Sequence, residues 1–494
     1  MGCGASSNQQ KYAVDQTQPD LAILIEQQSR QIGQLLESQE QLNVKISKLN
    51  ERLGRYDKPA QGFVEQSSGH TQRPLSSSSK YRLSSEQAID VSADLPSALQ
   101  LIPAIQNYAW GKPWEASLVA KLCETPERQL DRTLRYAEMW MGTHPNGPSS
   151  VKMESSDGVQ SKVTSLKDAI AENAEYWLGK DASRGDLPYL LKVLSIHQAL
   201  SIQAHPRKKL AEYLHYTYPD RYKDANHKPE IALPLGEFEA LVGFRPFTDI
   251  QRHVGQVREL QKILGTKPQF SLKDLYTRLM TADADLVAQQ VGSLVHRLSR
   301  REEAELSPEE KLILRLQKDY PGDVGILSVY FLNYVHISAE QSNTYIYCAP
   351  DEPHAYLWGD CVECMALSDN VVRAGLTPKF KDVDTLLDMM AYQDDRLAKL
   401  VGTGEMVSDN VVKYDPPVQD FKVFAASGAT SHPLDLPNAS ICICVQGSFS
   451  IDFAGNNFSQ VEEMRAGMTY FCRAGTQLHA LRSEEGSKLF VATY

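Results

Sequence analysis

Hydrophobic runs predict mostly short strands from about residue 101 onward. The stretch 187–206, LPYLLKVLSIHQALSIQAHP, holds two apolar strand-like runs, and 335–375 reads as short strands broken by Pro and Gly. The stretch 413–494 returns to strands such as ASICICVQGSFSIDF and SKLFVATY, separated by turns such as AGNN and RAGT. This pattern predicts antiparallel β structure, with a second β barrel or sandwich at the C-terminus.

Between the two β regions, the spacing of apolar residues changes. In DIQRHVGQVRELQKILG and DADLVAQQVGSLVHRLSR, apolar residues recur at the spacing of one helix face. The pattern predicts an α-helical insertion over 248–321.

The first 96 residues differ from the rest in composition. Their Ser-rich part, EQSSGHTQRPLSSSSKYRLSSEQ, cannot bury enough apolar surface to fold alone and is interpreted as a disordered linker. Residues 20–56 carry a heptad-like seam that predicts a short coiled coil and self-association; a lone amphipathic helix packed on the main body is the alternative. The apolar seam consists of Leu21, Ile25, Ile32, Leu35, Leu42, Ile46, Leu49 and Leu53.

The opening residues, MGCGAS, match the pattern for N-terminal lipidation. Gly2 followed by Ser6 is typical of N-myristoylation, and Cys3 beside it is a candidate palmitoylation site. One acyl chain binds a protein to a membrane weakly, whereas two bind it stably. Acylation of both Gly2 and Cys3 therefore predicts a tether to a cytoplasmic membrane face.

Charge and cysteine content narrow the classes of protein. The net charge of −11 argues against a broad nucleic-acid interface, which needs a basic face. The eight cysteines are scattered, and neither an apolar signal segment nor a run of ~18 apolar residues is present, so a reducing, cytoplasmic compartment is expected. Cys361 and Cys364 form a CxxC without a second ligand pair and are interpreted as packed thiols.

Four residues form a candidate metal site. Gln203 and His205 lie two apart on a predicted strand, so their side chains share a face. Glu230 and His354 each directly follow a proline that constrains the backbone. This mixed oxygen and nitrogen set suits Zn²⁺. Each residue also has an ordinary alternative, a buried core histidine or a turn, and spacing alone does not bring the segments together.

Long motifs resemble one enzyme family. IQNYAWGKPW, YAEMWMGTHPNGPS, the stretch 187–206, NHKPEIALPLGEFEALVGFRP, PDEPHAYLWGDCVECMALSDNVVRAGLTPKFKDV and the terminal FVATY occur in the order found in type I mannose-6-phosphate isomerase. The similarity covers about residues 101–494. The segment 1–96 has no counterpart in the family.

The resemblance implies a mainly β fold with a helical insertion. It implies a cupin-type β-barrel catalytic domain and a C-terminal cupin-like β domain. The expected plan is an N-terminal extension at 1–96, catalytic parts at 97–247 and 322–412, a helical insertion at 248–321 and the C-terminal domain at 413–494.

The resemblance also implies the reaction and its metal. The family interconverts mannose 6-phosphate and fructose 6-phosphate, which supplies GDP-mannose synthesis and glycosylation. It implies one Zn²⁺ per subunit on Gln203, His205, Glu230 and His354, and an essential Arg373. All five residues are present.

Other roles stay open in the sequence. The proton must move through a cis-enediol, and Glu363, Asp369, Lys228 or a metal-bound water are candidates to carry it, because a guanidinium is a poor base. Ser201, Lys192, Lys228 and Lys379 are candidates for the phosphate. Trp110 is either a wall of the sugar pocket or a core residue.

Two non-enzymatic classes compete with the isomerase hypothesis. One is a cupin scaffold that binds sugar or metal at a membrane without catalysis, and the other is a coiled-coil assembly protein with a passive globular body. The intact set of five residues favours the enzyme. The enzyme hypothesis predicts that 97–494 alone retains turnover, whereas the assembly hypothesis predicts that loss of 1–96 abolishes function.

Overall fold

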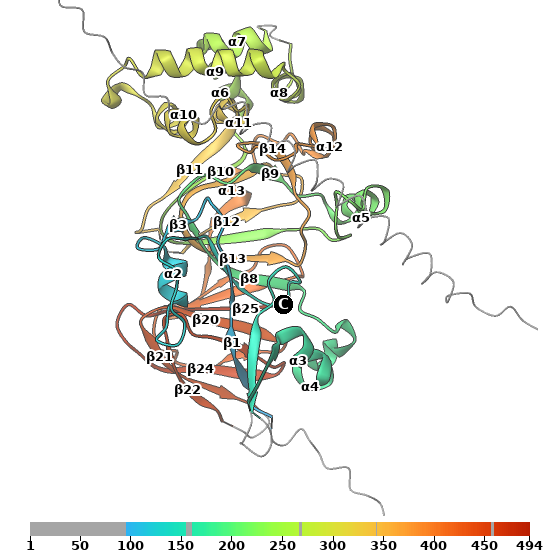
Figure 1. Cartoon of the computed structure of the whole chain (residues 1–494), viewed down its shortest axis with the longest axis vertical. Coiled ribbons are helices and arrows are strands. Elements are labelled where there is room, and N and C mark those ends of the chain that lie inside the picture. Colours follow the sequence, from blue (N-terminus) through green and yellow to red (C-terminus); the bar gives the residue numbers. More distant parts are fainter. Residues whose placement is uncertain (1–94, 155–160, 266–268, 342, 456–458) are drawn as a thin grey trace, which may run out of the picture. The chain divides into compact units, whose positions relative to one another are not determined.

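The computed structural model describes residues 95–154, 161–265, 269–341, 343–455 and 459–494. The predictions for Gly2, Cys3, the coiled coil at 20–56 and the Ser-rich linker lie outside these residues. Within the described part, the mainly β architecture with a helical insertion is confirmed (Figure 1).

A ten-stranded antiparallel sheet carries the candidate metal site. Its main path runs β15-β12-β10-β13-β8-β5-β2; β11 pairs with β10, and β9 pairs with both β13 and β14. The long strands β10 and β13 form its centre, buried along most of their length. The bounds are β2 (Ala104–Gln106), β5 (Glu138–Met141), β8 (Tyr189–Ile196), β9 (Ile202–Ala204), β10 (Glu230–Phe244), β11 (Leu332–Ile337), β12 (Thr344–Cys348), β13 (His354–Ala366), β14 (Val372–Gly375) and β15 (Val401–Thr403).

The C-terminal region builds two further sheets. A nine-stranded sheet runs β16-β17-β18-β25-β20-β23-β1-β6-β7, and a four-stranded sheet runs β19-β24-β21-β22. Three strands from the stretch 97–247 therefore complete a sheet whose other strands follow residue 404. The bounds are β1 (Ala98–Ile102), β6 (Ser150–Glu154), β7 (Ser161–Ser165), β16 (Glu405–Ser408), β17 (Val411–Tyr414), β18 (Lys422–Ala426), β19 (Leu434–Leu436), β20 (Ser440–Gln446), β21 (Ser448–Ala454), β22 (Val461–Arg465), β23 (Thr469–Cys472), β24 (Thr476–Ser483) and β25 (Lys488–Thr493).

The helical insertion packs on the end of the ten-stranded sheet (Figure 1). Ser271 and Ser307 begin α8 and α10 with capping boxes, as their sequence positions favour. Apolar residues of these helices share a core with Leu241, Phe244 and Val372 of the sheet. The insertion contains α6 (Phe247–Gln256), α7 (Arg258–Leu264), α8 (Leu272–Met280), α9 (Ala284–Leu298), α10 (Pro308–Asp319) and α11 (Gly325–Ser328).

Short elements outside the insertion connect the sheets. The two-stranded ribbon β3-β4 lies in the chain between β2 and β5 of the ten-stranded sheet, and α5 follows β9. The bounds are β3 (Lys112–Pro113), β4 (Arg135–Tyr136), α2 (Leu118–Cys123), α3 (Leu166–Glu172), α4 (Ala174–Leu178), α5 (Lys208–Thr217), α12 (Val383–Met389) and α13 (Leu397–Leu400).

Cys361 and Cys364 lie on opposite faces of β13. Each belongs to a different hydrophobic cluster, and both thiols are buried, which raises their pKa values. Since strand neighbours an odd number apart point away from each other, the two sulfurs cannot share one ion. Their interpretation as packed thiols is confirmed.

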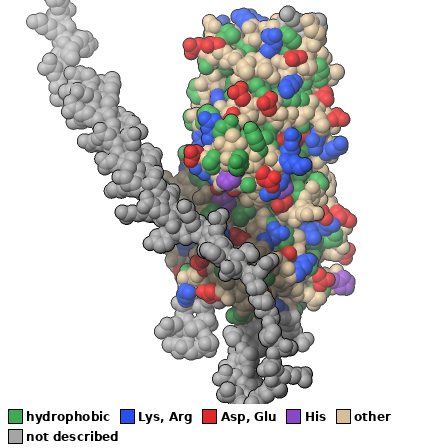
Figure 2. All heavy atoms as spheres, turned by 90° about the vertical axis from the view of Figure 1, so that its right-hand side faces the viewer, with side chains coloured by type: hydrophobic (Ala, Val, Ile, Leu, Met, Phe, Trp, Pro, Cys, Tyr) green, Lys and Arg blue, Asp and Glu red, His purple; other side chains and the backbone are tan. Residues whose placement is uncertain are grey.

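The surface mixes both signs of charge. Acidic and basic side chains are interspersed over the face in Figure 2, with histidines near its middle. Among the described helices, none combines the length and the apolar character needed to cross a membrane.

Candidate metal centre and active site

The short strand β9 brings the candidate ligands together. Gln203 lies opposite His354 of β13 on one side and opposite Arg373 of β14 on the other. His205 follows directly after β9, and Glu230 opens β10. The end of β9, the starts of β10 and β13, and β14 therefore meet at this point.

Three buried side chains converge on one point. His205, Glu230 and His354 each offer one donor atom, and these atoms lie within 4.8 Å of one another. Nε2 of His205 is 3.4 Å from Oε1 of Glu230, and Nε2 of His354 is 3.5 Å from Oε2. All three residues are at most 2% exposed.

Hydrogen bonds at the far side of each imidazole orient the pair. Nδ1 of His205 lies 2.7 Å from the Asn370 carbonyl oxygen, and Nδ1 of His354 lies 3.0 Å from the Glu352 carbonyl oxygen. A carbonyl only accepts, so each Nδ1 carries a hydrogen and Nε2 faces Glu230. Neither Nε2 nor Oε2 of Glu230 has a hydrogen-bond partner within the described residues. Buried nitrogen and oxygen lone pairs without hydrogen-bond partners are suited to bind a metal cation.

Charges and burial shift the pKa values of the three ligands in different directions. Burial lowers the pKa of His205 to about 4, which keeps it neutral and able to ligate. Burial opposes ionisation of Glu230, but Lys228 and His205 outweigh it and hold its pKa well below the usual value. Burial likewise opposes the charged form of His354, but Cys348 and Glu230 raise its pKa, so a cation would displace a proton there.

A cavity of about 930 Å³ opens beside the ligands. His205 and His354 lie behind its wall, fully buried. Every other candidate named for ligation, catalysis or substrate binding lines this cavity: Trp110, Lys192, Ser201, Gln203, Lys228, Glu230, Glu363, Asp369, Arg373 and Lys379. One site therefore contains residues that the sequence places on at least six separate segments.

The four cations in the cavity are not equivalent. Nζ of Lys192 is 3.0 Å from Oε2 of Glu363, and Nζ of Lys228 is 3.1 Å from Oε1 of Glu230. Within the described part of the chain, neither Arg373 nor Lys379 forms a side-chain ion pair. Burial lowers the pKa of Arg373, whose guanidinium keeps its charge in any case. These two cations are free to hold an anion.

Lys192 joins two carboxylates at the cavity wall. Besides Glu363, it lies 3.6 Å from Oε2 of Glu138, and the indole N–H of Trp140 also donates to that carboxylate. Burial disfavours the charged lysine, but Glu138 and Glu363 raise its pKa. Burial raises the pKa of Glu363. The group is a buried triad in which one cation is shared by two carboxylates.

Sequence reasoning missed several polar groups in this cavity. Glu138, His144 and Asn146 line it but were not named as candidates. His144 and Asn146 follow the buried strand β5, the same arrangement of polar residues after an apolar run that singled out His205. That signal was present in the sequence, but nothing there pairs Glu138 with Lys192.

Comparison with known proteins agrees with this geometry. The model described as the catalytic domain of type I phosphomannose isomerase matches residues 98–247, and the model for the helical insertion domain matches 249–332. Mannose-6-phosphate isomerase of Macaca fascicularis is 41% identical over 384 residues, which cover 72% of this chain and 88% of that protein. Mannose-6-phosphate isomerase 1 of Arabidopsis thaliana is 36% identical over 411 residues, covering 79% and 92%.

Solved structures have the same fold. A mutant of phosphomannose isomerase from Salmonella typhimurium superposes with a TM-score of 0.70 at 28% identity, covering 81% of this chain and 99% of that one. A mannose 6-phosphate isomerase bound with zinc and yttrium gives a TM-score of 0.68 with the same coverage. The resemblance is confirmed: the chain belongs to the type I phosphomannose isomerase family.

Proposed function

We propose that the chain interconverts mannose 6-phosphate and fructose 6-phosphate, using one Zn²⁺ per subunit. The observation that carries this proposal is the set of unpaired donors on His205, Glu230 and His354 at the wall of a cavity that also holds the free guanidinium of Arg373. The names of the relatives supply the substrate. The mannose 6-phosphate that the chain forms would supply GDP-mannose synthesis.

Gln203, His205, Glu230 and His354 would hold the metal. Two neutral imidazoles, one amide and one carboxylate leave a bound Zn²⁺ with net positive charge, which stabilises negative charge on the neighbouring sugar oxygens during enolisation. Ser201 supports this arrangement, because its hydroxyl donates to Oε1 of Gln203 at 3.4 Å. A solved relative is bound with zinc and yttrium, which supports zinc as the metal.

Arg373 and Lys379 would bind the anionic parts of the substrate. Arg373 lies opposite Gln203 across β14 and β9, so it is placed for the oxygens near the reacting carbons. Lys379 lies on an exposed loop that lines the cavity, which suits the phosphate at the other end of the sugar. Lys192 and Lys228 are already neutralised by carboxylates and serve the phosphate less well.

Asp369 is the candidate that best suits proton transfer. Glu363 and Lys228 are each engaged in a buried ion pair, whereas Asp369 is exposed to the cavity and receives hydrogen bonds from His144 and Asn146. The hydrogen bond from His144 lowers its pKa, which keeps the carboxylate ionised.

Turnover of purified protein on mannose 6-phosphate tests the proposal. We expect formation of fructose 6-phosphate and, in D₂O, incorporation of deuterium from the solvent, because the proton passes through a side chain of the protein. Glucose 6-phosphate, which differs at C2, serves as the comparison substrate. Metal-loaded, folded protein that binds the sugar phosphate without turnover would favour the non-catalytic cupin scaffold instead.

The N-terminal segment is proposed to direct location. Acylation of Gly2 and Cys3 would tether the enzyme at a cytoplasmic membrane face, and residues 20–56 would pair two copies. Gly2→Ala is expected to move the protein from the membrane fraction to the soluble fraction, with turnover per molecule unchanged. A membrane share that stays the same in the Gly2→Ala variant would exclude the tether.

A further inference from the structure

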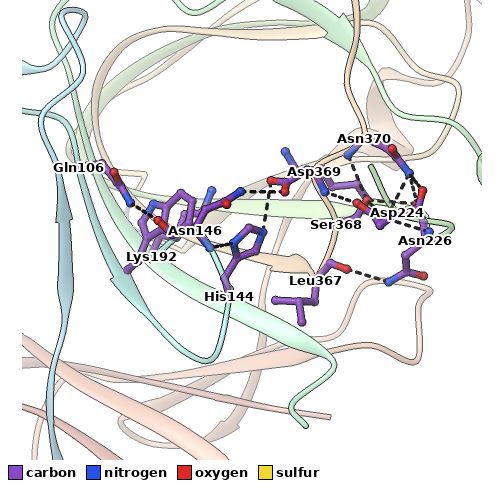
Figure 3. Close-up of polar contacts among 12 residues, drawn as sticks. Gln106, His144, Asn146, Lys192, Asp224, Asn226, Leu367, Ser368, Asp369 and Asn370 are labelled. Carbon is purple, nitrogen blue, oxygen red and sulfur yellow. Dashed lines mark hydrogen bonds and ion pairs between the residues drawn. The ribbon is translucent and has the colours of Figure 1, made fainter. Parts of the chain in front are cut away.

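Every polar atom of the Asp369 side chain is held by a named donor (Figure 3). Oδ1 lies 3.3 Å from Nε2 of His144, and Oδ2 accepts from Nδ2 of Asn146 at 3.0 Å. The backbone N–H of Asp369 donates to Oδ2 of Asp224 at 2.7 Å. The segment after β5 therefore contacts the Asp369 carboxylate, and the segment before β10 binds the Asp369 backbone.

The tautomer of His144 follows from its other contact. The backbone N–H of Asn146 donates to Nδ1 of His144 at 3.2 Å, so Nδ1 carries a lone pair and the neutral ring has its hydrogen on Nε2. That nitrogen lies 3.3 Å from Oδ1 of Asp369. His144 is 2% exposed, and its ring meets Trp140 edge-on at 5.0 Å, so the imidazole has no room to turn away.

More distant charged groups also influence the pKa of Asp369. Lys228 and Lys192 lower its pKa, but the hydrogen bond from His144 is the larger cause. Both lysines are already paired with Glu230 and Glu363. His144 and Asn146 are thus the two groups in direct contact with the carboxylate, and His144 is the one at Oδ1.

We propose that His144 is a positioning residue for catalysis: its Nε2–H holds the Asp369 carboxylate in one orientation at the cavity wall. The inference rests on the proposed role of Asp369 in proton transfer. His144 does not itself touch the substrate in this account. It acts by removing the rotational freedom of Asp369, which would otherwise lower the fraction of productive geometries.

Two substitutions of His144 separate its two hydrogen bonds. In His144→Gln the side-chain amide can reach the place of Nε2 and still donate to Asp369. In His144→Asn the shorter amide keeps an acceptor for the Asn146 N–H but cannot reach Asp369. We expect His144→Asn to lower kcat about tenfold to a hundredfold with KM little changed, and His144→Gln to stay within about threefold of the parent.

A double variant distinguishes this role from general support of the fold. In protein that carries Asp369→Asn, adding His144→Asn should lower kcat by less than about twofold, because the carboxylate it positions is gone. The proposal would be overturned if His144→Asn lowered kcat equally in the parent and in the Asp369→Asn protein. It would also be overturned if His144→Gln and His144→Asn lowered kcat equally, or if Asp369→Asn kept the turnover of the parent. Failure of the proposed function would differ, because the parent protein would then show no turnover.

Discussion

Replacing Glu230 by glutamine is expected to abolish metal retention and to lower turnover by roughly three orders of magnitude. The carboxylate is the one anionic member of the ligand set, and it lies 3.4–3.5 Å from Nε2 of both histidines. Without it, Lys228 is left beside the ligands with no partner for its charge, which repels a cation further. Metal content per subunit and kcat measured on the same preparation test this expectation.

The same strand offers a matched control for this substitution. Glu237 lies on β10 with its side chain exposed, so Glu237→Gln should leave both metal content and turnover unchanged. Thermal unfolding of both variants reports whether they are folded. A folded Glu230→Gln protein with a full complement of zinc would show that the ion binds elsewhere.

Lys192→Met is expected to destabilise the protein by about 3–5 kcal/mol at neutral pH. The substitution leaves the carboxylates of Glu138 and Glu363 buried without their shared cation. Urea denaturation of the parent and the variant measures the difference in the free energy of unfolding. The exposed lysine of the ion pair between Lys162 and Glu172 provides the comparison, since Lys162→Met should cost less than about 1 kcal/mol.

The effect of Lys192→Met should depend on pH in a defined direction. Burial raises the pKa of Glu363 in the folded protein above its value of about 4.3 in the unfolded chain, and loss of the lysine raises it further. A group with a raised folded pKa loses its stabilising contribution as the pH rises through that pKa. The loss of stability should therefore be smaller near pH 5 than near pH 8. Adding Glu363→Gln should restore part of it. A loss that is the same at both pH values would contradict the buried triad.

The sequence predicted those parts of the site that depend on local spacing. Gln203 and His205 were found by strand alternation, and Glu230 and His354 by the prolines before them. Their convergence depends on β9 pairing with β13 and β14, a contact between segments about 150 residues apart. No local pattern specifies such a pairing, and only the family resemblance indicated it.

Long-range pairing also explains what sequence reasoning did not foresee. β1 joins β23 and β6 in the nine-stranded sheet, so a strand near residue 100 pairs with one near residue 470. Alternation in the sequence predicts that a strand exists, but not which sheet it completes. The partnership of Lys192 with Glu138 is likewise a consequence of β5 lying beside β8.

An isomerase assay with and without a chelator tests whether the reaction depends on the metal. Purified protein is assayed on mannose 6-phosphate as isolated, after treatment with a chelator, and after Zn²⁺ is added back. We expect turnover that is lost with the metal, restored by zinc, and not restored in the Glu230→Gln variant. Full turnover of metal-free protein, or no turnover of folded protein with zinc at the ligands, would contradict this expectation.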